Sequence, residues 1–141
     1  MDGLIGEEFV QKETGQDDLT QISRLALVID TSRQSVYDLH EFLPNLNHLI
    51  LDNSSISCVR DLGVGLRNLT SLSLSRCGLC DIDGIGVLTG LQDLSLSHNF
   101  IIDATPLAMH ENLQVSLSEK KKLLIPIDQR MLHFLFHRIS I

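Results

Sequence analysis

Residues 69–100 read LTSLSLSRCGLCDIDGIGVLTGLQDLSLSHNF, and this stretch contains one pattern twice. Leu69, Leu72 and Leu74 of the first copy return as leucines at positions 91, 94 and 96 of the second copy. The step from position 69 to position 91 is 22 residues. A period of this length indicates one supersecondary unit repeated along an axis, in which each unit buries its leucines against its neighbours.

The period and the L-x-x-L-x-L frame are those of a leucine-rich repeat. The frame extends to four repeats that start near residues 22, 46, 69 and 91. The L-x-L centre of each repeat is expected to form a short strand, because leucine and polar residues alternate there. The return leg has apolar residues at every third position, which favours 3₁₀ or short helical turns. The sequence therefore predicts an α/β fold: a right-handed solenoid with parallel strands on its concave face and helical turns on its convex face.

One position after each strand is typically an asparagine, whose side-chain amide bonds main-chain groups inside the turn. In the four repeats this turn position is expected to hold Asp30, Ser54, Cys77 and Asn99. All four side chains are small, and Asn99 alone is the preferred amide.

The repeats divide the chain into three parts. Residues 1–18 are polar and interrupted by glycines, which favours a disordered or loosely docked segment over a brief amphipathic one formed by Leu4, Ile5, Phe9 and Val10. Residues 19–113 form the repeat domain, and residues 114–141 a divergent tail. A fifth repeat at Leu113 fails in the strict frame, although a shift by one residue brings Val115 and Leu117 into it. The tail is either a half-formed cap or, as the abrupt loss of the repeat favours, a foreign end from alternative splicing or truncation.

Composition excludes several classes of protein. The chain has 141 residues and a net charge of −7, which does not favour nucleic acid as a partner. No run of 18 apolar residues is present, so no membrane span is expected. The acidic start is unlike a secretion signal, and the three cysteines are an odd number, so we expect a cytoplasmic, monomeric protein with reduced thiols.

Candidate chemistry in the sequence is weak. Cys77 and Cys80 have C-x-x-C spacing, but no second such pair follows, and Cys77 is expected to fill the turn position. The six histidines lack a neighbouring nucleophile with an orienting acid, and the glycines of GVGLRN (63–68) do not form a phosphate-binding loop. We therefore expect neither catalysis nor a cofactor nor a metal, and the rival hypothesis is a redox or metal enzyme centred on the cysteine pair.

What remains as a functional surface is the concave face, where such solenoids usually bind other proteins. Serines recur at its outward positions and are flanked by charged residues. The candidate partner-binding residues are His48, Ile50, Asp52, Ser71, Ser73, Ser75, Arg76, Asp93, Ser95, Ser97 and His98.

Three phrases go beyond a generic repeat: RDLG (60–63), RCGL followed by DGI (76–85), and D-x-x-PL (103–107). In this order they resemble the leucine-rich repeat-containing protein 56 family, a cytoplasmic and ciliary group, over residues 42–107. The resemblance implies a non-enzymatic role in the assembly or intraflagellar transport of outer dynein arms. The tail does not fit the further repeats of that family, which indicates a truncated or alternatively spliced form. The alternative is a regulatory subunit of a phosphatase or other enzyme complex, since similar short repeats serve that purpose.

Overall fold

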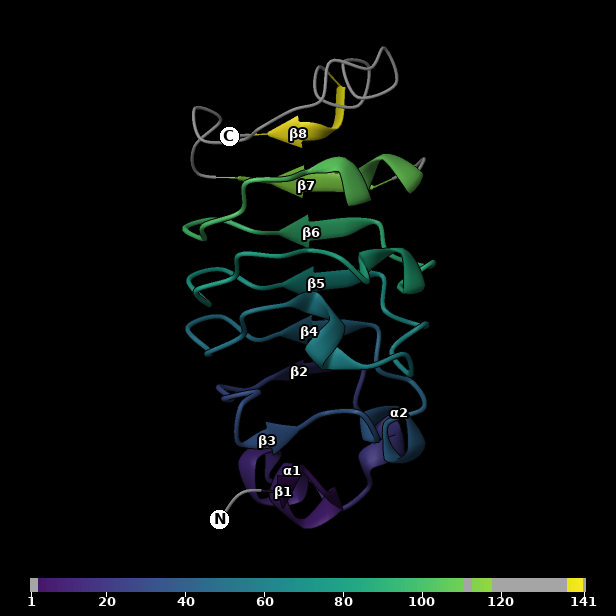
Figure 1. Cartoon of the computed structure of the whole chain (residues 1–141). Coiled ribbons are helices and arrows are strands. Elements are labelled where there is room, and N and C mark those ends of the chain that lie inside the picture. Colours follow the sequence, from purple (N-terminus) through teal and green to yellow (C-terminus); the bar gives the residue numbers. More distant parts are fainter. Residues whose placement is uncertain (1–2, 111–112, 118–136, 141) are drawn as a thin grey trace.

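Six short parallel strands form one sheet along the length of the molecule (Figure 1). The computed structural model describes residues 3–110, 113–117 and 137–140. In spatial order the strands are β2 (Arg24–Ala26), β4 (His48–Ile50), β5 (Ser71–Ser73), β6 (Asp93–Ser95), β7 (Gln114–Ser116) and β8 (Ile139–Ser140). The predicted parallel solenoid is confirmed.

The register of the sheet joins the central residue of each strand to that of the next. Leu25 pairs with Leu49, which pairs with Leu72, then Leu94, then Val115. Each of these side chains is at most 2% exposed. Alternation of inward leucine and outward polar residue is therefore what sets the pairing, because a slip by one residue would expose every leucine.

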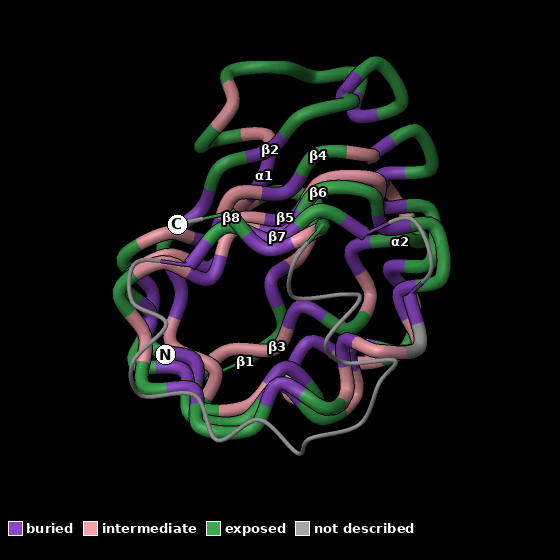
Figure 2. The backbone as a smooth tube through the Cα atoms, turned by 90° about the horizontal axis from the view of Figure 1, so that it is seen from above, coloured by how far each residue is buried: buried purple, intermediate pink, exposed green. Residues whose placement is uncertain are grey.

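Short helices form most of the return legs, on the side opposite the sheet. They are η1 (Leu19–Gln21), α2 (Leu39–Phe42), η2 (Val59–Leu62), η3 (Ile85–Val87) and η4 (Thr105–Met109), and all but α2 are 3₁₀ helices. Seen along the stack, successive coils lie over one another with a gradual offset, and buried residues recur along each coil (Figure 2). None of the helices within the described ranges is long and apolar enough to cross a membrane.

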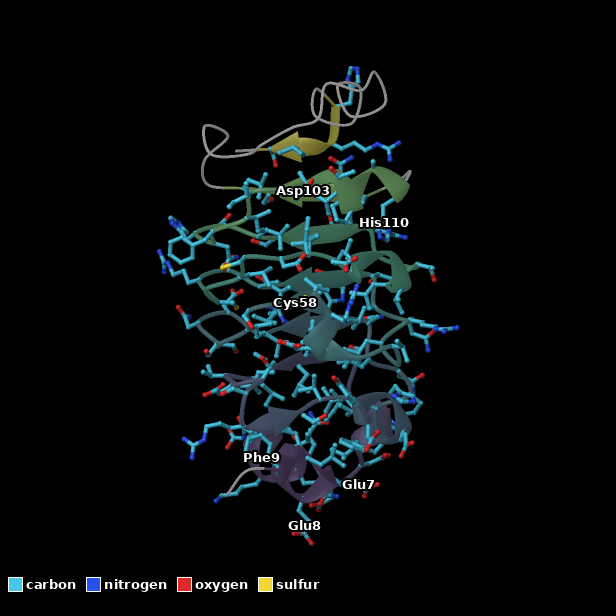
Figure 3. The ribbon with its side chains drawn as sticks, in the orientation of Figure 1. Glu7, Glu8, Phe9, Cys58, Asp103 and His110 are labelled. Carbon is cyan, nitrogen blue, oxygen red and sulfur yellow. The ribbon has the colours of Figure 1, made fainter. Side chains whose placement is uncertain are left out.

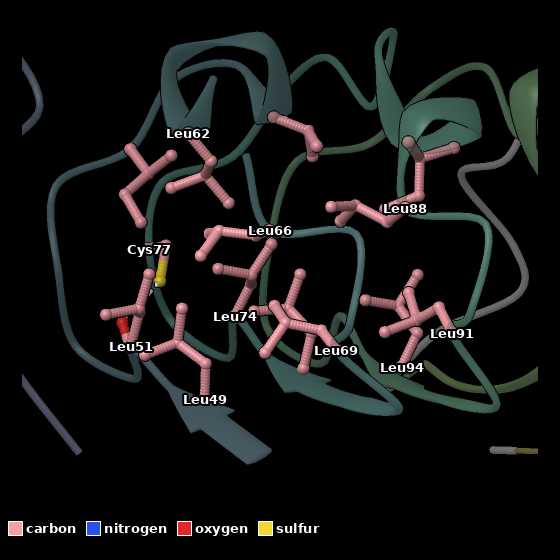
Figure 4. Packing of buried hydrophobic residues seen from close by; sticks show 14 of the residues in the cluster. Leu49, Leu51, Leu62, Leu66, Leu69, Leu74, Cys77, Leu88, Leu91 and Leu94 are labelled. Carbon is pink, nitrogen blue, oxygen red and sulfur yellow. Dashed lines mark hydrogen bonds between the residues drawn. The ribbon is translucent and has the colours of Figure 1, made fainter. Parts of the chain in front are cut away.

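A single hydrophobic cluster runs through the stack from Ile5 to Ile139. Leucines dominate it, and those of consecutive repeats contact one another between the sheet and the return legs (Figure 4). Burial of each leucine contributes about 1.5–3 kcal/mol relative to exposure. Repeats stacked in this way supply the stability that no single repeat has alone.

The N-terminal segment differs from the expectation of a disordered or loosely docked lead-in. Strand β1 (Gly3–Leu4) pairs in parallel with β3 (Gln34–Ser35), and α1 (Glu7–Thr14) follows at the N-terminal end of the stack (Figure 1). Val10 is fully buried in the common core. Gly15, at φ 68°, ends α1 in the left-handed conformation that favours glycine, so this glycine stops a helix rather than preventing one.

The C-terminal boundary also differs from the expected one. Strand β7 lies within the segment assigned to the tail, and it continues the sheet in the frame shifted by one residue. Successive mid-strand partners are 24, 23, 22 and 21 residues apart, so the fifth repeat continues a steady shortening. Ile139 of β8 pairs with Val115 and is 7% exposed. Residues 118–136 and 141 lie outside the described residues, so the choice between a cap and a foreign end stays a prediction for them.

The turn position is filled as expected in the last two complete repeats. The Asn99 amide donates to the carbonyls of Leu74 (2.6 Å) and Leu96 (3.1 Å), and its oxygen accepts from the N–H groups of Cys77 and Leu79 (3.0 Å each). These bonds tie two adjacent turns together.

Ser54 of the second repeat also lies at the turn position, as expected, whereas the first repeat differs. Ser54 Oγ accepts from the N–H of Ile29 at 2.9 Å. Asp30, which was expected there, instead accepts from the N–H of Ser32 at 2.9 Å and pairs with Ser55 of the next coil. The prediction for Asp30 is wrong by one residue: the buried Ile29 lies at the turn position, four residues after Leu25, whereas Ser54 lies five residues after Leu49.

Candidate binding face

The outward side of the sheet, called the concave face here, carries three parallel rows of side chains. Each row takes one residue from each of three adjacent repeats, and the rows alternate with the buried leucines. The rows are His48, Ser71 and Asp93; Ile50, Ser73 and Ser95; and Asp52, Ser75 and Ser97. The sequence-predicted residues thus share one surface, on which His48 and Asp93 are exposed and the other seven half-buried.

Asp52 is held in place by the neighbouring repeat. Its Oδ1 accepts from the Ser73 hydroxyl at 2.5 Å and from the main-chain N–H of Ser75 at 2.9 Å. The Ser75 hydroxyl in turn lies 2.8 Å from that of Ser95. Asp52 and the serines therefore form a hydrogen-bonded chain across three repeats, and no donor among the residues that the structure describes bonds the second carboxylate oxygen of Asp52.

Arg76 and His98, the remaining predicted residues, lie immediately beyond the third row. Both are exposed, and both have positive φ (57° and 59°), as does Asn53 (63°) at the same place in the preceding repeat. Such angles are uncommon for residues other than glycine. The recurring conformation turns the chain at the end of each strand, and it places three polar side chains along one rim of the concave face.

The concave face is longer than the sequence indicated. Gln114 pairs with Asp93 and Ser116 with Ser95, and both are exposed, so β7 extends the first two rows. On the other side Arg24, which the leucine frame also predicts to face outward, pairs with His48 and extends the first row to β2. The steadily shortening period was the signal that could have identified Gln114 and Ser116.

The cysteine pair is not brought together as a reactive site. Cys77 is buried, and its Sγ donates to the Leu51 carbonyl at 3.1 Å (Figure 4). Burial raises the pKa of the Cys77 thiol above its ordinary value. Cys80 is exposed on the turn that follows. Within residues 3–110, 113–117 and 137–140, no group of three or more His, Cys, Asp and Glu side chains is arranged to hold a metal ion.

Burial likewise raises the pKa of Cys58, which lies on the return-leg side of the coil (Figure 3). His110 is buried there near the C-terminal end, and its Nε2 lies 2.9 Å from the Ile85 carbonyl (Figure 3). That histidine therefore joins two return legs.

The glycines of GVGLRN have a packing role. A Cβ on Gly63 would lie 2.6 Å from Cδ1 of the Tyr37 ring, and a Cβ on Gly65 would collide with the His40 ring. These contacts line an open hollow of about 610 Å³ between the first two return legs. The cluster therefore permits close packing of Tyr37 and His40.

Comparisons with known proteins show which proteins this chain is similar to. No family model matches the chain. The chain is 42% identical over 99 residues to leucine-rich repeat-containing protein 56 of Mus musculus, covering 70% of this chain and 18% of that protein. It is 32% identical over 114 residues to the homolog from Trypanosoma brucei brucei, covering 79% of this chain and 15% of that protein. The chain thus spans less than a fifth of the length of the curated relatives it matches.

Among solved structures, internalin C2 of Listeria monocytogenes superposes with a TM-score of 0.60 at 27% sequence identity, over 86% of this chain and 51% of that chain. The structural comparison and the sequence comparison both identify leucine-rich-repeat proteins. The chain is a leucine-rich-repeat protein, and its curated homologues, across mammals and a trypanosome, are named leucine-rich repeat-containing protein 56.

Proposed function

We propose that the chain is a non-enzymatic adaptor that binds a protein partner through its concave face. The observation that carries the proposal is the continuous polar surface across β4, β5 and β6, with Asp52 oriented by Ser73 and Ser75. A carboxylate already held in one position loses little freedom when it accepts a lysine or arginine of a partner. The exposed Asp93, one repeat further, supplies a second acid on the same face.

We further propose that the chain acts in the cytoplasm and the cilium, in the assembly or intraflagellar transport of outer dynein arms. This ciliary role rests on the resemblance to the leucine-rich repeat-containing protein 56 family. Phrases RDLG, RCGL and D-x-x-PL support it, and they lie within the repeat domain that forms the concave face.

The test is affinity capture from ciliated cells with the full chain and two double variants. Ser73→Arg with Ser95→Arg places two long cations in the centre of the concave face. Ser57→Arg with Thr89→Arg adds the same charge at exposed positions outside that face.

We expect the native chain and the second variant to capture outer-dynein-arm or transport-particle subunits, and the first variant to lose them. Failure of the native chain to capture either group, while a longer family member succeeds, would overturn the ciliary role. Equal capture by both variants would overturn the concave face as the binding surface.

A further inference from the structure

Strand β2 is the N-terminal edge of the sheet, and it is paired on one side only, with β4. The Ser23 carbonyl accepts from the N–H of His48, and the N–H of Leu27 donates to the Ile50 carbonyl. In a parallel pair, alternate residues face the partner strand, so Arg24 and Ala26 direct their main-chain N–H and C=O groups away from β4. Across the described part of the chain, no hydrogen bond reaches these outward groups.

A groove of about 410 Å³ runs along this edge, between β2 and the end of α1. One wall is β2 itself, and the other is formed by Glu13, Thr14, Gln16 and Gln21. Val28, which follows β2 along the chain, is 69% exposed. The groove therefore combines the outward main-chain groups of β2 with polar walls, and Val28 follows two residues after Ala26, the last lining residue of β2.

The N-terminal segment beside the groove is acidic, while Arg24 on the β2 wall is a cation. The segment from Gly3 to Asp18 contains five exposed acids, at positions 7, 8, 13, 17 and 18, against the single cation Lys12. Glu7 and Glu8 point outward at this end of the molecule (Figure 3). Such a cluster attracts a basic segment at physiological ionic strength over distances of about 8 Å.

We propose that the β2 edge binds an extended, basic segment of a protein partner by strand addition. The segment would pair its main chain with Arg24 and Ala26, place an apolar side chain on Val28, and direct lysines or arginines toward Glu13 and the acids beside it. Main-chain bonds give affinity in such complexes, and alternate side chains give specificity. This surface is separate from the concave-face site, because it uses main-chain groups of β2 rather than side chains of β4 to β6.

The experiment uses two capped peptides of equal charge, Lys-Val-Lys-Val-Thr-Val-Lys and Lys-Pro-Pro-Lys-Pro-Pro-Lys, with the full chain; the prolines of the second interrupt the N–H groups on both edges of a strand. Fluorescence anisotropy at physiological salt measures their affinities. We expect the first peptide to bind about tenfold more tightly or better, since prolines remove the N–H groups that strand addition needs. Equal affinity would mean attraction by charge alone and would overturn strand addition, as would the absence of binding.

A substitution in the protein, rather than in the peptide, also tests pairing at the β2 edge. Ala26→Pro removes an outward N–H that the sheet does not use, so the fold is expected to persist, whereas Ala26→Ser keeps the N–H as a matched control. Tighter binding of the valine peptide should be lost in the first variant and kept in the second.

Amide hydrogen exchange of the native chain tests whether the peptide pairs with β2, and it does so even if Ala26→Pro does not fold. On saturation with the valine peptide, the amides of Arg24 and Ala26 should become protected. Protection confined to β4, β5 and β6 would overturn the proposal.

Discussion

At the scale of single residues, the turn positions of the second, third and fourth repeats show how different side chains bond main-chain groups at the same place in the fold. Asn99 joins two turns through donors and acceptors at once. Ser54 accepts a single main-chain bond, and Cys77 donates one through its sulfur. The main-chain groups inside a buried turn need partners, and an amide satisfies them most completely.

Replacement of Asn99 by alanine should therefore be costly. Main-chain N–H groups of Cys77 and Leu79 lose their acceptor, and the carbonyls of Leu74 and Leu96 lose a donor. We expect a loss of about 3 kcal/mol in the free energy of unfolding, measured by urea denaturation. The exposed Asn68→Ala is the control, and equal effects of the two substitutions would contradict the assignment of Asn99.

Asp103 gives a prediction about pH. The hydroxyl and the N–H of Thr105 donate to its carboxylate and lower its pKa below the ordinary 3.8. The unfolded chain then binds this proton more tightly, so the contribution to stability is present above pH 3.8 and is lost as the pH falls through the folded pKa. Thr105→Val removes the hydroxyl, the larger cause, and should raise the pKa of Asp103 toward 3.8 in a carbon-13 NMR titration. Thr89→Val is the control, and an unchanged Asp103 titration in Thr105→Val would refute the role of the hydroxyl.

At the scale of elements, each strand is only two or three residues long, and buried leucines hold it in place. Leu74 and Leu96 follow β5 and β6 and are at most 1% exposed. Either residue changed to alanine should lower the free energy of unfolding by about 2–5 kcal/mol, because it leaves a cavity between two repeats. Leu4→Ala, at a position 55% exposed, should cost far less. An unchanged denaturation midpoint for Leu74→Ala would contradict the register.

Some helices and strands could be predicted from the sequence, and others could not. Periodic leucines predicted β4, β5 and β6 and the rows of the concave face, because burial and strand period leave one arrangement for them. Helix α1 corresponds to the less favoured alternative for the N-terminal segment, because its single fully buried residue, Val10, gives no periodicity and its flanking glycines suggested disorder. The free edge of β2 could not be foreseen, because which strand groups lack partners depends on how the N-terminal segment packs.

At the scale of the whole molecule, the hydrophobic core is shielded from water at the ends of the stack only if other residues cover the first and last repeats. Beyond β7, the Leu117 N–H donates to the Ser140 carbonyl at 2.9 Å, and Arg138 Nη1 donates to the His110 carbonyl at 3.0 Å. Ile139 adds a buried side chain at this end. These contacts come from the last residues of the chain and cover the C-terminal repeat.

A chain that ends at Glu119 should therefore be less stable than the full chain, by about 2 kcal/mol for the lost burial of Ile139. Hydrogen exchange should rise most in β7 and least in β4. Ile139→Asp in the full chain should reproduce the pattern. If the shortened chain unfolds at the same urea concentration with β7 equally protected, β8 does not act as a cap, and the foreign-end hypothesis is favoured.

The sheet has a mechanical consequence as well. Each inner strand is hydrogen-bonded to its two neighbours alone, and every repeat is connected to the next in one direction along the chain. A force applied between the two ends is therefore carried by the repeats in series. Each repeat that gives way releases a length of about 75 Å when fully extended. Under tension the molecule would lengthen in steps, one coil after another, and behave as an extensible tether.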